Sequence, residues 1–287
     1  MAKRSILKAQ DNYLGEKEYK ESKSVRFSSN KKTVLLLADS FGQRISPYLG
    51  EAEPFDIYNY NCPVGHHDIG GTESTFRVMN RSRGGRKLAD GFSQSLVEEI
   101  MFYKPSCIVV MAGMCDVASM TSNDHNSHWF YDTVINVGGD FRAKANLLAQ
   151  DDTDREYVEN IILHVAFLQN WGVEYTPRQG CVSPYDASKI RSVNMKFAKR
   201  NVVSLFKEHN ILLVDLCVPN PGRDDNLHYD SVTSSKLADR FILIAMRYLC
   251  IRKNCRNRTL LHKDALKSCI EQRAKDLVEA LSCNDHA

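Results

Sequence analysis

Short apolar runs alternate along the chain with longer amphipathic stretches. An aliphatic run at 33–38 and another within 106–116, which stops at a glycine and an acid, have the unbroken apolar character of strands buried on both faces. Residues 210–217 share this character, and 55–62 and 172–177 also suit strands, the last one interrupted by a proline. The pattern therefore predicts about five strands.

Between these runs, apolar residues recur at the spacing of an amphipathic helix. Residues 119–150 are the hardest to assign, with a weakly helical pattern only at 141–150. Clearer helices are predicted at 84–105, 155–171, 187–209 and 234–249. Strands that alternate with helices indicate βαβ units, so the expected fold class is α/β with a parallel sheet.

The ends of the chain differ from this central pattern. Residues 1–30 are polar and rich in Lys and Ser, which predicts a flexible arm. Residues 31–250 hold the alternating pattern and form the predicted domain, and 251–287 form a basic, amphipathic helical tail. A chain of 287 residues with 43% hydrophobic content is long enough for one large domain with such extensions.

The composition indicates in which cellular compartment the protein is expected. No stretch approaches the roughly 18 apolar residues of a membrane helix, and the first residues lack the apolar core of a secretory signal. The nine cysteines are an odd number and are scattered, which does not suggest a disulfide framework. We therefore expect a reduced, intracellular protein, in the cytoplasm rather than the nucleus, with an unknown oligomeric state.

The tail region suggests one partner. The net charge of +3 does not by itself argue for nucleic acid, but 247–267 contains seven basic residues against Asp264 alone. Such a segment is commonly a solvated helical face, and clustered Arg and Lys also suit phosphate backbones. The apolar stripe that follows it could dock on the domain, pair with another chain or bind a partner.

Candidate catalytic residues follow three of the predicted strands. Ser40 follows the strand at 33–38. Residues 113–116 end the run within 106–116, and Asp225 and His228 follow the strand at 210–217. In a parallel sheet these positions meet at the edge where α/β proteins bind ligands. A Ser, an Asp and a His in this order are the parts of a hydrolytic triad, although Asp39 and Ser40 are also ordinary turn formers.

The arrangement of these motifs resembles the SGNH or GDSL-type hydrolases over residues 31–250. Block I, normally Gly-Asp-Ser, is Ala38-Asp39-Ser40, and block V, normally Asp-x-x-His, is intact at 225–228. Block II supplies a glycine, best matched by Gly85 with Gly84 as the alternative, and block III, normally Gly-x-Asn-Asp, is 113–116 with Cys115 in place of Asn. The resemblance implies a three-layer α/β/α sandwich of flavodoxin-like topology.

The resemblance also implies an activity. It predicts a serine esterase or acyl hydrolase for an acetyl or lipid ester, with Ser40, His228 and Asp225 as the triad and neither metal nor cofactor. Ser40, Gly85 and the residue at position 115 would form the oxyanion hole. Because a thiol is a weaker donor than an amide, Cys115 leaves open a rival prediction, a weak or inactive module that binds a protein or nucleic acid.

Other candidate sites have simpler structural explanations. Cys115 as a nucleophile lacks a nearby cation in the sequence, so a structural thiol is preferred. His66-His67-Asp68 could suggest a metal site, but adjacent residues in a loop rarely share one ion. The role of Arg44, as surface cover or as a contact for an anionic substrate, stays open. A zinc site in the tail is likewise disfavoured, because the spacing matches no familiar finger: Cys250, Cys255, His262 and Cys269.

Overall fold

The structure is a computed structural model, and its described residues belong to the unit that begins at Lys32. The arm at 1–30, the strands predicted at 55–62 and 172–177, and the tail beyond Arg256 lie outside the described residues. The described residues are 32–49, 66–69, 76–120, 128–169, 182–225 and 227–256.

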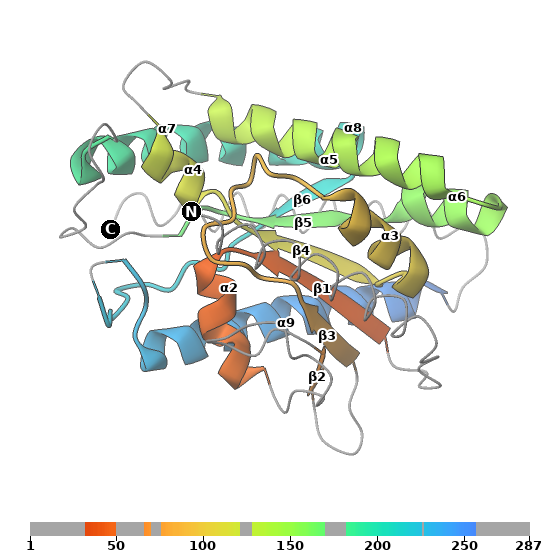
Figure 1. The fold of residues 1–287 in the computed structure, drawn as a ribbon, viewed down its shortest axis with the longest axis horizontal. Helices are drawn as coiled ribbons and strands as arrows, with labels where there is room; N and C mark the ends of the chain where they lie inside the picture. The colour runs from red at the N-terminus through yellow and green to blue at the C-terminus, as the bar shows by residue number, and fades with distance from the viewer. Residues whose placement is uncertain are drawn as a thin grey trace, which may run out of the picture. The chain divides into compact units, whose positions relative to one another are not determined.

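A six-stranded sheet forms the centre of this unit (Figure 1). Its order is β2-β3-β1-β4-β5-β6, in which β2 pairs antiparallel with β3 and all the other pairs are parallel. The prediction of about five parallel strands is confirmed, and their order is that of flavodoxin-like folds. The strands are β1 (Lys32–Ala38), β2 (His66–Ile69), β3 (Phe76–Asn80), β4 (Cys107–Met111), β5 (Leu163–Ala166) and β6 (Ile211–Val214).

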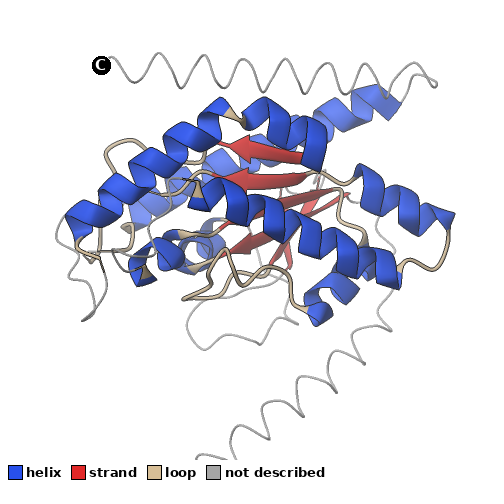
Figure 2. Cartoon of the chain, turned by 90° about the horizontal axis from the view of Figure 1, so that it is seen from above, coloured by secondary structure: helices blue, strands red, loops and turns tan. Residues whose placement is uncertain are grey.

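Helices cover both faces of the sheet, which gives the predicted three layers (Figures 1 and 2). The helix that follows β1 packs against the last helix on one face, and the helices between them pack against one another on the other face. The first face holds α2 (Ser40–Ile45), the 3₁₀ turn η1 (Ser46–Tyr48) and α9 (Ser231–Arg256). The second holds α3 (Gln94–Tyr103), α4 (Met114–Ser119), α5 (Trp129–Leu148), α6 (Asp152–Asn160), α7 (Pro184–Arg200) and α8 (Val202–His209).

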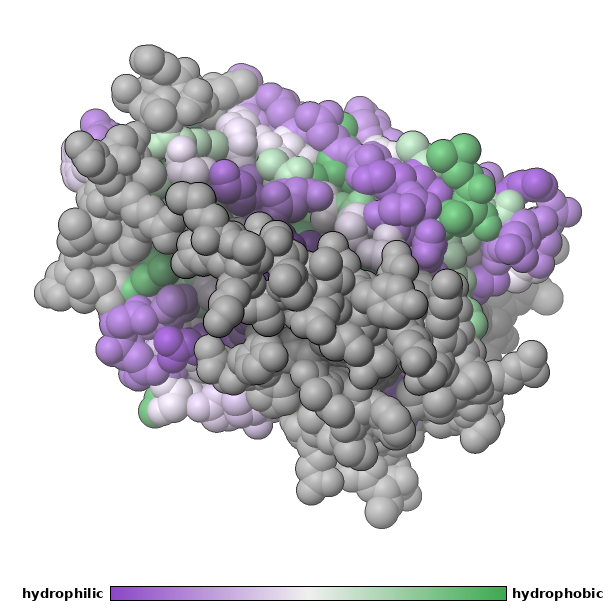
Figure 3. Space-filling model, viewed as in Figure 1, coloured by the Kyte–Doolittle hydropathy of each residue, from purple (hydrophilic) through white to green (hydrophobic). Residues whose placement is uncertain are grey.

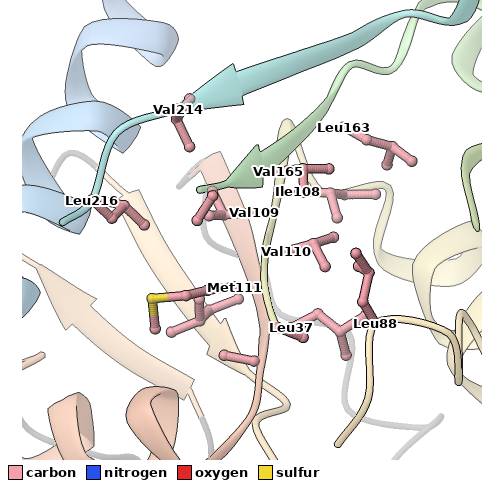
Figure 4. Close-up of a cluster of buried hydrophobic side chains, with 14 of the residues drawn as sticks. Leu37, Leu88, Ile108, Val109, Val110, Met111, Leu163, Val165, Val214 and Leu216 are labelled. Carbon is pink, nitrogen blue, oxygen red and sulfur yellow. The ribbon is translucent and has the colours of Figure 1, made fainter. Parts of the chain in front are cut away.

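The central strands β1 and β4 are mostly apolar because both of their faces are covered. Every residue of β4, and every residue of β1 after Thr33, is buried. Figure 4 shows side chains of β1, β4, β5 and β6 together in this core. Leu88, from the loop after β3, belongs to the same cluster and is 2% exposed. The core therefore holds that loop as well as the strands.

The helix predicted at 155–171 is wrong in its second half. The helix α6 begins at an N-cap, Asp151, whose side chain accepts the Asp154 N–H, and it ends at Asn160. The apolar residues that follow form the buried strand β5. Periodicity alone does not distinguish a buried strand from a continuing helix in a short apolar run, which explains the error.

Four further segments differ from the prediction. The helix expected at 84–105 starts only at Gln94, where Ser93 accepts the Leu96 N–H as N-cap. The segment 187–209 is two helices that meet at Asn201. The strand β3 was not predicted, and α5 fills most of the stretch that was hard to assign.

The described surface is predominantly hydrophilic on the face shown in Figure 3, with scattered hydrophobic groups. Isolated exposed apolar residues are usual for protein surfaces and do not mark an interface. None of the helices in the described part of the chain has the length and apolar character needed to cross a bilayer.

Candidate active site

The turn after β1 presents Ser40 as the first residue of α2. Asp39 is buried and acts as N-cap, because its carboxylate accepts the Phe41 N–H at 3.0 Å. A Cβ on Gly42 would lie 2.2 Å from Ser82 Oγ and 2.4 Å from the Ala38 Cβ. Glycine is thus required at position 42 for α2 to approach the sheet this closely, and the turn that suggested a nucleophile is a sharp strand-to-helix junction.

The segment between β6 and α9 brings two further side chains to this junction. His228 Nε2 lies 3.0 Å from Ser40 Oγ, and His228 Nδ1 lies 2.8 Å from Asp225 Oδ2. The other carboxylate oxygen, Oδ1, accepts the backbone N–H groups of Leu227 and His228. The structure therefore places Ser40, His228 and Asp225 in one hydrogen-bonded chain.

The environment of Asp225 favours its ionised form. Partial desolvation opposes ionisation, but the hydrogen bonds from the His228 backbone, the His228 ring and the Leu227 backbone together outweigh it. The pKa of Asp225 is consequently held well below its usual range. An ionised Asp225 holds the imidazole with Nδ1 protonated, which leaves Nε2 to accept a proton from Ser40.

Aromatic packing fixes the position of the His228 ring. The ring of Phe41, next to the serine, lies 6.1 Å from the His228 ring and 4.7 Å from the Tyr229 ring, measured between centroids. Tyr229 is buried, and its hydroxyl donates to Gln169 Oε1 at 3.3 Å. The loop that carries His228 is thus packed onto α2 through apolar contacts as well as the hydrogen bond.

Arg44, whose role the sequence left open, joins the same two segments. It lies one helical turn after Ser40, and its Nη1 is 3.0 Å from Asp224 Oδ2. Its Nη2 is 3.7 Å from Asp225 Oδ2, the oxygen that also contacts the His228 ring. Arg44 therefore ties the loop of Asp225 to the helix of Ser40.

The loop after β3, which carries block II of the motif, connects the ends of β1 and β4. Its Arg83 N–H donates to the Ala38 carbonyl at 2.9 Å. Further along, the Leu88 and Ala89 N–H groups donate to the Asp116 carboxylate at 2.6 and 3.1 Å. Gly85 lies between these anchors with φ +75° and open space around its Cα, as suits a turn close to a ligand.

Block III forms the start of α4 beside this loop. Gly113 has φ +123°, and a Cβ there would lie 2.5 Å from Leu168 Cδ2, so this position also requires glycine. Cys115 is half-buried in the first turn of α4. Burial, together with the nearby carboxyls of Asp39 and Asp116, raises the pKa of the Cys115 thiol to about 11. Cys115 is therefore an un-ionised thiol, and its assignment to an oxyanion hole with Ser40 and Gly85 stays a prediction.

Two acids were quoted in the sequence motifs without a role. Asp116 holds the block II loop through its two backbone hydrogen bonds, and Asp39 caps α2. Burial raises the pKa of Asp39 to about 7, to which the charge of Asp116 contributes. The position of Asp39, directly before the first residue of a helix, could have indicated an N-cap from the sequence. The contacts of Asp116 could not have been found in this way, because they depend on the fold.

The candidate metal ligands fall outside the side chains that the structure describes. His66, His67 and Asp68 lie on β2, and Cys250 and Cys255 lie on α9, with only their backbone described. His262 and Cys269 lie beyond the described residues. Among the residues that were searched, which are the described ones, no cluster of three or more His, Cys, Asp and Glu could hold a metal ion.

Comparisons with known proteins find similarity in structure alone. No protein-family model and no curated protein sequence matches the chain. A carbohydrate esterase family 3 structure from Talaromyces cellulolyticus has 13% identity and a TM-score of 0.44, over 75% of this chain and 97% of that one. A putative arylesterase from Agrobacterium tumefaciens has 13% identity and a TM-score of 0.45, over 76% and 99% of the two chains.

A GDSL-like lipase from Bacteroides thetaiotaomicron has 13% identity and a TM-score of 0.46, over 80% of this chain and 97% of that one. At such identities and TM-scores, these structures assign no activity to this chain. Their names are those of esterases and of a GDSL-like lipase.

Proposed function

We propose that the protein hydrolyses carboxylic esters, with Ser40 as nucleophile, His228 as general base and Asp225 as the residue that orients the imidazole. One observation carries this proposal: Ser40 Oγ, the His228 ring and the Asp225 carboxylate form a continuous chain with contacts of 3.0 and 2.8 Å. Both distances are within the range for proton transfer between a nucleophile and its base.

The reaction proceeds in two halves. Ser40 Oγ attacks the ester carbonyl carbon while His228 Nε2 takes its proton, and a tetrahedral oxyanion forms. The carbon–oxygen bond to the alcohol then breaks, and His228 returns the proton to the leaving alcohol. Water, activated by the same imidazole, hydrolyses the acyl-serine, releases the acid and restores Ser40. No metal or cofactor is needed for these steps.

The developing oxyanion requires donors. Here the backbone N–H groups of Ser40 and Gly85 are the main candidates, with the Cys115 thiol as a weak third donor. Replacement of a strong oxyanion donor costs roughly 10²–10³ in turnover in a well-studied protease. We therefore expect a functional but slow esterase.

The substrate follows from the resemblance. Solved structures that share the fold include an acetyl esterase, an arylesterase and a GDSL-like lipase, according to their names. On this basis we propose an acetyl or lipid ester as the substrate of this chain.

The test is p-nitrophenyl acetate turnover by the full chain and by its Ser40→Ala variant. We expect the variant to lose at least about a thousandfold in kcat, as nucleophile deletions do in serine hydrolases. Ser95→Ala, an exposed serine on α3, is the matched control and should retain the wild-type rate. Equal turnover by wild type and Ser40→Ala would overturn the triad.

The second candidate function is a module that binds a partner without catalysis, and Cys115 in the oxyanion motif favours it. A fluorophosphonate probe separates the two functions, because it labels an activated serine without needing the natural substrate. Labelling at Ser40 supports the esterase, and a folded chain that the probe leaves unmodified supports the module. Nucleic-acid binding through 247–267 stays a prediction from sequence, since this segment extends beyond the described residues.

A further inference from the structure

The basic loop, residues 83–88, spans the point where the strand order of the sheet reverses. Its first residue is bound to the end of β1 through the Ala38 carbonyl, and its last is bound to Asp116 at the start of α4, just after β4. Neighbouring strands β1 and β4 are those from which the chain proceeds in opposite directions across the sheet. Open α/β sheets bind their ligands at this position.

The basic loop also lies against the helix of Ser40. A Cβ on Gly84 would be 3.0 Å from Gln43 Oε1, and the neighbouring Ser82 fills the space next to Gly42. The loop is therefore adjacent to α2 within four residues of the proposed nucleophile. The basic loop thus lies beside the helix that carries Ser40.

Three cations are concentrated on this short loop: Arg83, Arg86 and Lys87. Asp90 lies 3.4 Å from the Arg83 guanidinium and accepts the Lys87 backbone N–H. Of the three basic side chains, it therefore forms an ion pair with Arg83 alone. Of the other nearby acids, Asp116 already accepts two backbone N–H groups and Asp39 is the buried cap of α2. Among the described residues, only Arg83 of these three cations has an acid within ion-pair distance.

Arg86 has an unused donor. Its buried Nε has no hydrogen-bond partner among the described residues, and its Nη2 donates to the Arg81 carbonyl at 3.5 Å. A buried N–H group without a partner is unfavourable. The side chain as a whole is only half-buried, and a planar guanidinium matches carboxylate and phosphate oxygens, so an anionic group fits Arg86.

We propose that the basic loop is an anion subsite beside Ser40, and that the substrate is an ester carrying a carboxylate or phosphate group. The ester part of this inference rests on the proposed function, whereas the anion part rests on the loop itself. The anion belongs to the acyl part or to the alcohol part of the ester, and the experiment distinguishes these two sources.

Two pairs of matched esters provide the test. The acyl arm compares p-nitrophenyl hexanoate with the p-nitrophenyl half-ester of adipate, which has the same carbon chain and a terminal carboxylate. The alcohol arm compares 4-acetoxybenzamide with 4-acetoxybenzoate. In one arm, wild-type kcat/KM should favour the anionic ester about 25-fold, and the arm that shows this preference identifies the position of the anion.

Variants connect the preference to the loop. Arg86→Gln and Lys87→Gln should each lower the anionic-to-neutral ratio about fivefold, the factor expected for two unit charges about 4 Å apart in water. Arg86→Lys keeps the charge but loses the planar donor, and should give an intermediate ratio. Arg155→Gln is the control, because Arg155 is an exposed arginine on α6, at the opposite end of the sheet (Figure 1). Its ratio should equal that of the wild type.

The outcomes separate the subsite from the esterase activity. Ratios near one in both arms, or ratios that Arg86→Gln and Lys87→Gln leave unchanged, overturn the anion subsite while the esterase stands. If no ester is hydrolysed, the proposed function fails, and calorimetric titration of the Ser40→Ala chain with both anionic esters decides the subsite. Binding that Arg86→Gln weakens by about fivefold or more supports it, and undetectable binding overturns it.

Discussion

At the scale of single residues, the acid next to the nucleophile is the most constrained group. Asp39 is fully buried, and its carboxyl accepts the backbone N–H that starts α2. Desolvation makes the charged form of this carboxyl unfavourable in the folded protein, and its pKa is about 7 compared with 3.8 for an exposed Asp. Folding therefore binds a proton at Asp39 between these two pH values.

This proton uptake predicts how stability changes with pH. Between about pH 4 and 7 the folded chain holds a proton at Asp39 that the unfolded chain has lost, so the free energy of unfolding falls as pH rises. Asp39→Asn keeps the acceptor but removes the charge. Relative to wild type, it should gain up to about 4 kcal/mol between pH 4 and pH 8, as a shift of about three pKa units implies.

Urea unfolding of both chains at four pH values from 4 to 8 measures this gain. The difference between the two chains isolates Asp39 from the other titrating groups. A difference that does not change with pH would show that Asp39 titrates in the folded protein as an exposed acid does.

Cys115 gives a second prediction at this scale. If position 115 contributes to the oxyanion hole, then Cys115→Asn supplies an amide donor and should raise kcat for p-nitrophenyl acetate, by up to about 10²–10³. Cys115→Ala is the matched control and should change kcat little, because the thiol it removes is a weak donor. An unchanged or lower rate in a folded Cys115→Asn chain would favour the binding module.

At the scale of elements, the site depends on how one helix and one loop are held together. Ser40 begins α2, and Asp225 and His228 lie in the loop before α9. Phe41 packs against the rings of that loop, and Arg44 forms its two ion pairs with Asp224 and Asp225. The apolar contact sets the distance between the elements, and Arg44 sets the orientation of the acid.

Arg44 is accordingly a positioning residue for the proposed triad. Arg44→Gln should lower kcat about tenfold with little change in KM, since it disturbs the Asp225 carboxylate rather than substrate binding. Arg44→Lys should recover part of the rate, because it restores the charge without the paired donors. The loss of stability should stay within about 1 kcal/mol, as for other exposed ion pairs.

The measurement combines steady-state kinetics with the rate of fluorophosphonate labelling at Ser40. A structural role alone would lower the melting temperature and leave the labelling rate of the folded fraction unchanged. Labelling and kcat that both equal wild type in Arg44→Gln would contradict the positioning role.

At the scale of the whole molecule, the sequence predicted the central strands β1 and β4 better than it predicted the bounds of the helices. The aliphatic run before Asp39 and the one before Gly113 identified β1 and β4, because strands covered on both faces are apolar at every position. The short strand β5 was merged with α6, since its four buried residues continue an apolar pattern. The helix α5 was obscured by glycines that include Gly138, which packs closely against Ile211.

The sequence indicated those contacts of the candidate site that join residues close together in the chain. Asp225 and His228 are three residues apart, so their contact is local and a motif can reveal it. The contacts of Asp116 with the basic loop and of Arg44 with Asp224 join residues that are 28 and 180 positions apart. Such contacts are set by the packing of elements, and one sequence contains no direct signal for them.

The distance along the chain between Ser40 and His228 also has a consequence for biosynthesis. The two residues are 188 positions apart, and the strands β4, β5 and β6 are all made between them. At about 5–20 residues per second, the ribosome needs roughly 10–40 s to reach the histidine after it has added the serine. If His228 is the base of the proposed triad, Ser40 is an ordinary, unreactive hydroxyl throughout that interval, until the last part of the domain has emerged and folded.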